Sequence, residues 1–145
     1  MSKPVDRKAA FDLIPHEDFA ALVRDLVRRT GEDKGEATRL MDQAIAFVAT
    51  AADIWHGGRY GDLQHKLVPT KRIEAAWLVL IQHTVFMRAL AGSLGVFVDR
   101  IPYPEALQSD VEVTMAAIDA ANYALHPTVW DTDDPAEARA GILGV

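Results

Sequence analysis

The sequence predicts an all-α fold, a compact helical bundle of about four main helices with an apolar third helix at its centre. Three observations favour this class. Apolar residues recur at helical spacing in four segments, too few segments alternate for a sheet, and Pro or Gly residues stand at several expected segment ends. The 145 residues also have the composition of one globular domain. We expect residues 1–14 to be a loose arm, 15–130 a single helical domain, and 131–145 an acidic tail.

The first helix is expected over residues 15–30. Pro15 suits a first turn, where its missing N–H would be unpaired anyway, and Gly31 is a typical stop. The apolar residues follow helical spacing: Phe19, Leu22, Val23, Leu26 and Val27. The basic cluster on this helix consists of Arg24, Arg28 and Arg29. We interpret it as a solvated face whose cations suit the carboxyl end of a helix.

A second helix is expected over residues 33–52, with an apolar stripe and many alanines that allow close contact. Residues 53–69 form the longest irregular stretch, and a loop of this length is often functional. Its glycines match neither the dinucleotide-binding fingerprint nor a P-loop.

The third helix is expected from the N-cap Thr70 to about Ala91. It is apolar on nearly all sides, which is typical of a helix buried at a centre or an interface. Residues 92–95 break the pattern, and the segment 96–98 is β-branched and aromatic but too short to anchor a sheet alone. Pro102 and Pro104 open the fourth helix, and Pro127 ends it.

Composition excludes several classes of function. A net charge of −6 argues against a nucleic-acid binder. The absence of cysteine excludes disulfides, a thiolate metal site and a cysteine nucleophile. The apolar stretch 73–98 carries Arg88 near its middle, which favours a buried helix over a membrane span. Because no apolar segment follows the polar N-terminus, we expect no secretory signal and a cytoplasmic location.

No metal and no cofactor are expected. The five histidines include no pair at the i, i+3 or i+4 spacing that lets one helix face grip a metal, and no Glu-x-x-His pair occurs.

Three groups of residues are candidates for a site, each with a structural alternative. His83 is either hydrogen-bonded inside the core or lines a pocket as an acid, base or donor. Asp99 and Arg100 form either a surface pair at a turn or a polar pocket wall with Arg100 as an anion clamp. Trp55 and Tyr60, with His56 and His65, either pack the long loop on the bundle or form a pocket lid.

Short motifs in one order carry a resemblance to a known family. They are Leu40-Met41-Asp42-Gln43-Ala44-Ile45-Ala46-Phe47, Pro69-Thr70, Ala76-Trp77, His83-Thr84, Gly95-Val96-Phe97-Val98, Ile101-Pro102 and Pro127-Thr128-Val129-Trp130. This pattern resembles small, largely uncharacterised actinobacterial proteins related to the glycine-rich-domain-containing family. The resemblance implies a helical architecture and supplies no substrate. Leu78 and Asp99-Arg100 replace family histidines, and the family's tail cysteines are missing, so that His83 alone matches a histidine of the family.

The hypothesis we favour is a domain that binds a small molecule or a protein partner without a metal. Its pocket would lie between the third helix, the 55–65 loop and the segment 96–102, with Trp55, His56, Tyr60 and Trp77 as ligand-binding residues. The alternative is a small enzyme of an actinobacterial biosynthetic pathway, with His83 as general acid or base and Asp99 and Arg100 beside it. A helix apolar on all sides also makes a homodimer plausible.

Overall fold

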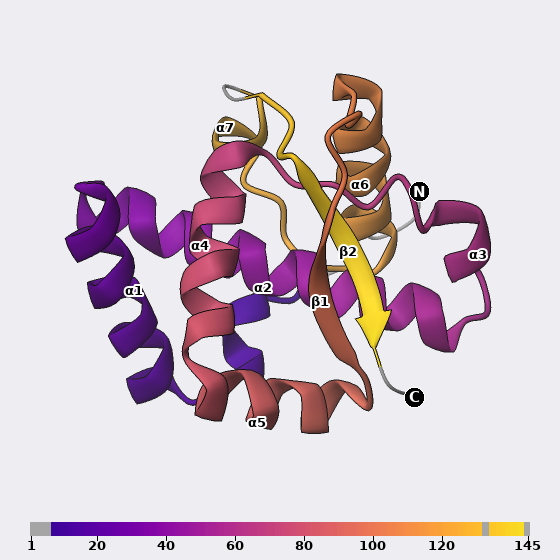
Figure 1. Cartoon of the computed structure of the whole chain (residues 1–145). Helices are drawn as coiled ribbons and strands as arrows, with labels where there is room; N and C mark the ends of the chain where they lie inside the picture. Colours follow the sequence, from indigo (N-terminus) through magenta and orange to yellow (C-terminus); the bar gives the residue numbers. More distant parts are fainter. Residues whose placement is uncertain (1–6, 132–133, 144–145) are drawn as a thin grey trace, which may run out of the picture.

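The computed structural model describes residues 7–131 and 134–143. Within them, helices make up most of the fold, and two short strands follow α5 and α7 (Figure 1). The elements are the 3-10 helix Ala10–Leu13, α1 His16–Thr30, α2 Lys34–His56, α3 Tyr60–Leu63, α4 Lys71–Gln82, α5 Thr84–Leu94, β1 Phe97–Pro102, α6 Gln108–Ala120, α7 Pro127–Trp130 and β2 Ala138–Leu143.

The fold is mostly helical, but the all-α prediction is wrong, because β1 and β2 form a two-stranded antiparallel sheet. The register pairs Phe97 with Leu143 and Pro102 with Ala138. The segment 96–98 was too short to suggest a sheet by itself, and its partner lies about forty residues later, in the predicted tail. Pairing between such distant segments leaves little local signal in either strand.

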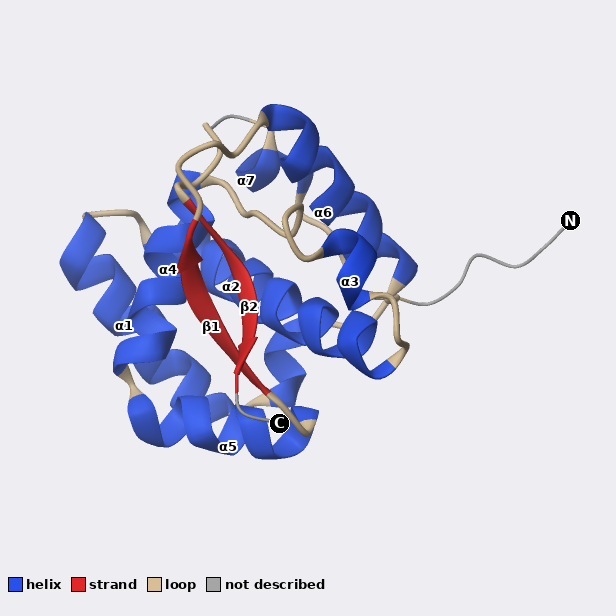
Figure 2. Cartoon of the chain, turned by 45° about the vertical axis from the view of Figure 1, so that its right-hand side comes forward, coloured by secondary structure: helices blue, strands red, loops and turns tan. Residues whose placement is uncertain are grey.

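The centre of the fold is α2 and not the predicted third helix. Every residue from Leu40 to Ala52 is buried. Alanines at several of these positions let other elements approach on all sides, so this middle part of α2 is fully buried, whereas both ends of the helix reach the surface. Figure 2 shows the β1–β2 ribbon crossing in front of α2, with α5 near one end of the ribbon and α7 near the other.

The predicted third helix is two helices, α4 and α5, which meet at His83 with a bend of 98°. Thr70 caps α4 as predicted, since its side chain accepts a hydrogen bond from the backbone of Ile73. The bend lets α4 bury Trp77 while α5 buries Met87 and Leu90 in a different direction. Among the helices that the structure describes, no single one is long and apolar enough to span a membrane. Only α4 and α5 taken together reach the required length and apolar composition, and that pair is sharply bent.

The predicted ends of the chain and of the fourth helix also differ. Part of the expected arm packs on α2, because Ala10 is buried and the backbone N–H of Phe11 donates to Asp42. Part of the expected tail is β2. Helix α6 begins at Gln108 and ends at Ala120, two residues before the left-handed Asn122 (φ 67°), so the predicted helix was too long at both ends. Residues 1–6, 132–133 and 144–145 of the predicted arm and tail lie outside the described residues.

Candidate ligand-binding site

Helix α1 presents three faces, and two of them line cavities. At 100° per residue, Leu22 and Leu26 share a face, which is fully buried in the core. Phe19, Val23 and Val27 share a second face, turned toward the start of α2. Ala21, Asp25 and Arg28 share the third, turned toward the bend between α4 and α5, and Arg24 lies between these last two faces.

The second face lines an apolar groove of about 520 Å³. Its lining residues are Phe19, Ala20, Val23, Arg24, Val27, Lys34 and Thr38. The floor is apolar, whereas Arg24 and Lys34 are exposed cations at the edge. Neither cation forms an ion pair with any residue in the described part of the chain. The groove therefore combines an apolar surface with two available positive charges.

The third face lines a smaller polar pocket of about 290 Å³, formed by Ala21, Arg24, Asp25, Arg28 and His83. Arg24 lines both the groove and this polar pocket. The two cavities therefore adjoin across one side chain.

Asp25 is a buried carboxylate in the polar pocket that contacts three basic side chains. Only 6% of it is exposed. Its Oδ2 lies 3.0 Å from Nε2 of His83 and 3.0 Å from Nε of Arg29, and its Oδ1 accepts a hydrogen bond from Arg28. The hydrogen bond from His83, together with those from Arg28 and Arg29, lowers the pKa of Asp25 from 3.8 to about 2, although burial acts in the opposite direction. The carboxylate is therefore ionised at neutral pH.

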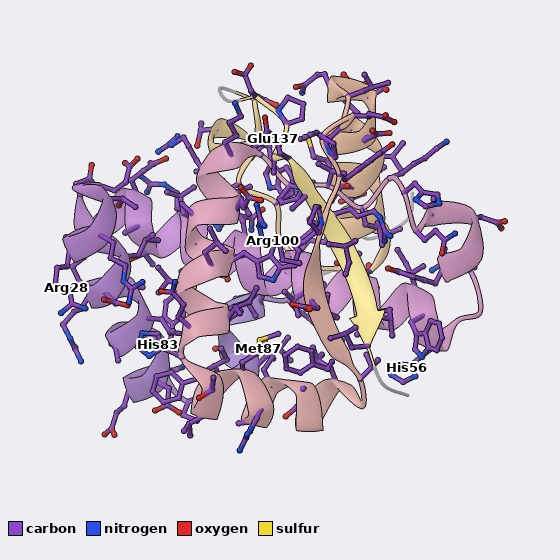
Figure 3. All side chains as sticks on the ribbon, in the orientation of Figure 1. Arg28, His56, His83, Met87, Arg100 and Glu137 are labelled. Carbon is purple, nitrogen blue, oxygen red and sulfur yellow. The ribbon has the colours of Figure 1, made fainter. Side chains whose placement is uncertain are left out.

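His83 occupies the bend between α4 and α5, outside helical geometry at φ −87° and ψ 74°. Its ring stacks on Phe86 with centroids 5.4 Å apart, and its side chain is 30% exposed. It lines the polar pocket and also a shallow cavity of about 400 Å³ formed by residues 82–86. Figure 3 shows His83 between α4 and α1, with Arg28 on the outer side of α1. His83 thus combines both sequence alternatives, a hydrogen-bonded structural role and a position in a cavity.

The remaining predicted site residues do not join His83. On β1, the Asp99 carboxylate accepts from the backbone of Arg100, and Nε of Arg100 donates to Glu74 at 2.9 Å. Arg100 and His83 lie on different elements and point to different surroundings (Figure 3). Arg100 therefore faces α4, which is part of the predicted third helix, but its partner there is Glu74 and not His83.

The aromatic residues of the predicted lid pack against their own surroundings. Trp55 and Tyr60 make an edge-to-face pair at 5.8 Å, and the Tyr60 hydroxyl donates to the carbonyl of Ala140 at 2.6 Å. His56 lies 2.7 Å from the carbonyl oxygen of Leu94. Trp77 is fully buried against Phe47, at 4.9 Å. None of Trp55, His56, Tyr60 and Trp77 lines the three cavities described above, so the predicted single pocket is not assembled from these residues.

Sequence reasoning missed Asp25 and Lys34 as site residues. A usable signal existed for Asp25, because it stands three and four residues before Arg28 and Arg29, the spacing of helix ion pairs. Its burial and its contact with His83, 58 residues later, depend on tertiary packing and leave no local mark.

Within residues 7–131 and 134–143, no group of three or more His, Asp or Glu side chains is placed to hold a metal ion. Comparisons with protein-family models, with curated proteins and with solved structures give no match to this chain.

Proposed function

We propose that this protein binds a small amphiphilic anion in the groove between α1 and the start of α2, without a metal. The observation that carries the proposal is the apolar floor of Phe19, Val23 and Val27 beside the cations Arg24 and Lys34. Ligand sites are mostly apolar with a few polar groups that fix orientation, and about 520 Å³ lies within their usual range.

The size of the groove favours a small molecule over a protein partner. At about 1.5 Å per residue, the floor from Phe19 to Val27 extends about 12 Å along α1. This length suits a medium-length hydrocarbon chain or one or two rings. The anionic group would lie at Arg24 or Lys34, where it gains an ion pair without displacing an existing one.

A pair of matched variants tests the location. Octanoate is the probe, and isothermal titration calorimetry is the measurement. Ala20→Trp fills the groove from α1, whereas Ala116→Trp places the same side chain on the exposed surface of α6. We expect Ala20→Trp to weaken octanoate binding about tenfold or more, with Ala116→Trp unchanged.

The charge requirement is tested separately. Arg24→Met and Lys34→Met should each weaken octanoate binding by about fivefold, and Arg88→Met on α5 is the control. Circular dichroism and thermal unfolding verify that each variant is folded. Absence of octanoate binding to the wild-type protein, or equal binding by Ala20→Trp and Ala116→Trp, would overturn the proposal.

A second candidate function is acid–base catalysis, favoured by the 3.0 Å contact between Asp25 and His83. A carboxylate bonded to one ring nitrogen orients the ring and leaves the other nitrogen for proton transfer. In this version Asp25, and not Asp99, is the carboxylate that orients the His83 ring. His83→Gln and Asp25→Asn should then both stop turnover of a metabolite mixture followed by proton NMR, whereas Asp99→Asn should not.

Three further predictions from the sequence, on location, family and oligomeric state, form part of the proposal. We expect a cytoplasmic protein, and the resemblance to the actinobacterial family stays a prediction. A homodimer also stays a prediction, and Leu78 and Val85, which are 37% and 74% exposed on α4 and α5, are the apolar side chains available to it. A monomer at micromolar concentration in analytical ultracentrifugation would contradict the dimer.

A further inference from the structure

We propose that the polar pocket is a subsite for a phosphate monoester, so that the ligand of the groove is an amphiphile with a phosphate head group. This inference rests on the proposed function and names the class of its ligand.

The first argument is the position of Arg24. On α1 it lies about 100° around the helix from Val23, between the groove face and the face that carries Ala21 and Arg28. A ligand whose apolar part contacts Val23 and Val27 therefore meets Arg24 at the edge of the groove. The next surface beyond Arg24 is the polar pocket.

The second argument is charge. The chain carries a net charge of −6, yet positive side chains dominate this pocket. Both oxygens of its carboxylate, Asp25, are already engaged by Arg28, Arg29 and His83. The guanidinium of Arg24 has no ion-pair partner in the described part of the chain, and Arg28 is 75% exposed beyond its contact with Asp25. An incoming anion thus meets two guanidinium groups, and the negative charge of Asp25 is already offset by its own basic partners.

The third argument is the number of donors. Arg24 and Arg28 each offer several N–H groups in a planar fork. Nε2 of His83 is held by Asp25, so Nδ1 is the ring nitrogen available to a ligand, and it donates when the ring is protonated. A phosphate monoester has three terminal oxygens and up to two negative charges, and it uses these donors more fully than a carboxylate with two oxygens and one charge.

The test compares octyl phosphate with octanoate on the full chain by calorimetry. We expect octyl phosphate to bind about tenfold more tightly, and His83→Gln to remove most of this preference, measured as the ratio of the two affinities in each variant. His16→Gln, which changes an exposed histidine on α1, is the matched control and should leave both affinities unchanged. Thermal unfolding verifies that His83→Gln remains folded. If it does not, Arg24→Lys replaces it, because it keeps the charge but loses the fork, and it should reduce the preference for phosphate.

The outcomes separate the two proposals. Equal affinities for octyl phosphate and octanoate overturn the phosphate subsite and leave the proposed function standing. Binding of neither probe overturns both. Vesicles containing phosphatidic acid distinguish a membrane lipid from a free phosphate monoester. For a free ligand, we expect the protein not to co-sediment with the vesicles. Co-sedimentation abolished by His83→Gln would assign the subsite to a lipid head group and overturn the free ligand.

Discussion

Nε2 of His83 lies 3.0 Å from Oδ2 of Asp25, and this contact ties α1 to the bend between α4 and α5. A second link joins Arg29 to Gln82, just before the bend. Because α1 supplies most of the groove floor, these contacts fix the position of one wall of the candidate site.

Replacing the buried carboxylate tests this link. We expect Asp25→Asn to lower the free energy of unfolding by about 2–3 kcal/mol, because Arg28, Arg29 and His83 lose a common charged acceptor. Urea unfolding followed by circular dichroism measures the change. Asp12→Asn is the matched control, since Asp12 faces His16 at 3.4 Å in an exposed pair, and it should cost less than about 0.5 kcal/mol. Equal effects of the two substitutions would contradict a structural role for Asp25.

The Asp25 contact also predicts a dependence on pH. Folding lowers the pKa of Asp25 from 3.8 to about 2, so the ionised carboxylate is the form that folding stabilises. Its contribution is complete above pH 3.8 and is lost as the pH falls toward 2. The difference in unfolding free energy between wild type and Asp25→Asn should therefore shrink as the pH falls through this range. A difference that stays constant down to pH 2 would show that the carboxylate charge contributes nothing.

Gln43 in α2 is fully buried and uses both ends of its amide in hydrogen bonds. Its Oε1 accepts from Nε1 of Trp130 at 2.7 Å and from the backbone of His126 at 3.2 Å. Its Nε2 donates to the Ala124 carbonyl and to Asp42, both at 2.9 Å. We expect Gln43→Leu to lower the free energy of unfolding by about 3 kcal/mol, because it leaves buried partners unpaired.

Tryptophan fluorescence during urea unfolding measures this loss, since Trp130 is one of the partners. Gln108→Leu, at the exposed start of α6, is the control and should change stability by less than about 0.5 kcal/mol. If Gln43→Leu unfolds within about 1 kcal/mol of the wild type, the network contributes little net stability.

Gln43 also shows how far the sequence could predict the fold. Asp42-Gln43 and Trp130 are both among the motifs that carry the family resemblance, but their direct contact in the structure is not something that the spacing in the sequence predicts. Helix periodicity located α1 and α2 to within a few residues, and it also located the start of α4. Burial of one helix face leaves such a local pattern in the sequence. The break at His83 left no such pattern, because α4 and α5 are both apolar on several sides and their change of direction depends on what they pack against.

The candidate site was predictable only in part. His83 was recognised because a histidine in an apolar segment is conspicuous, and the arginines of α1 were noticed as a cluster. Their partnership through Asp25 depends on packing between α1 and α4, which a single sequence does not encode in any spacing. The aromatic residues misled the prediction, because Trp55, Tyr60 and Trp77 are used to pack the fold.

The donor set predicts that the protein binds no stoichiometric transition metal. The sequence has no cysteine, and its histidines lie on separate elements, paired with Asp25, Asp42 and other single partners. Elemental analysis of protein purified without chelator should therefore give well under one zinc or iron per chain. One equivalent of either metal would contradict this expectation.

Gly141 in β2 lies against the side chain of Ile101 in β1, so a side chain at this position should displace Ile101 or the strand. A Cβ atom built at Gly141 would lie 2.8 Å from Cδ1 of Ile101 and closer still to Cγ1. We expect Gly141→Ala to lower the free energy of unfolding by about 1–3 kcal/mol, because Ile101 or the strand must move. Gly92→Ala, in α5 with nothing within 4 Å of its Cβ, should instead stabilise by about 0.5–1 kcal/mol, because alanine favours the helix.

A double-mutant cycle isolates the cause. Ile101→Ala removes the atoms that meet the new Cβ, so Gly141→Ala should cost less in that background than in the wild type, with a coupling of about 1 kcal/mol. Because β1 carries Arg100 and Asp99, loosened pairing should also disturb the contact of Arg100 with Glu74, and NMR of the arginine Nε–H reports it. Full additivity of the two substitutions would mean that Gly141 acts through backbone freedom and not through its contact with the Ile101 side chain.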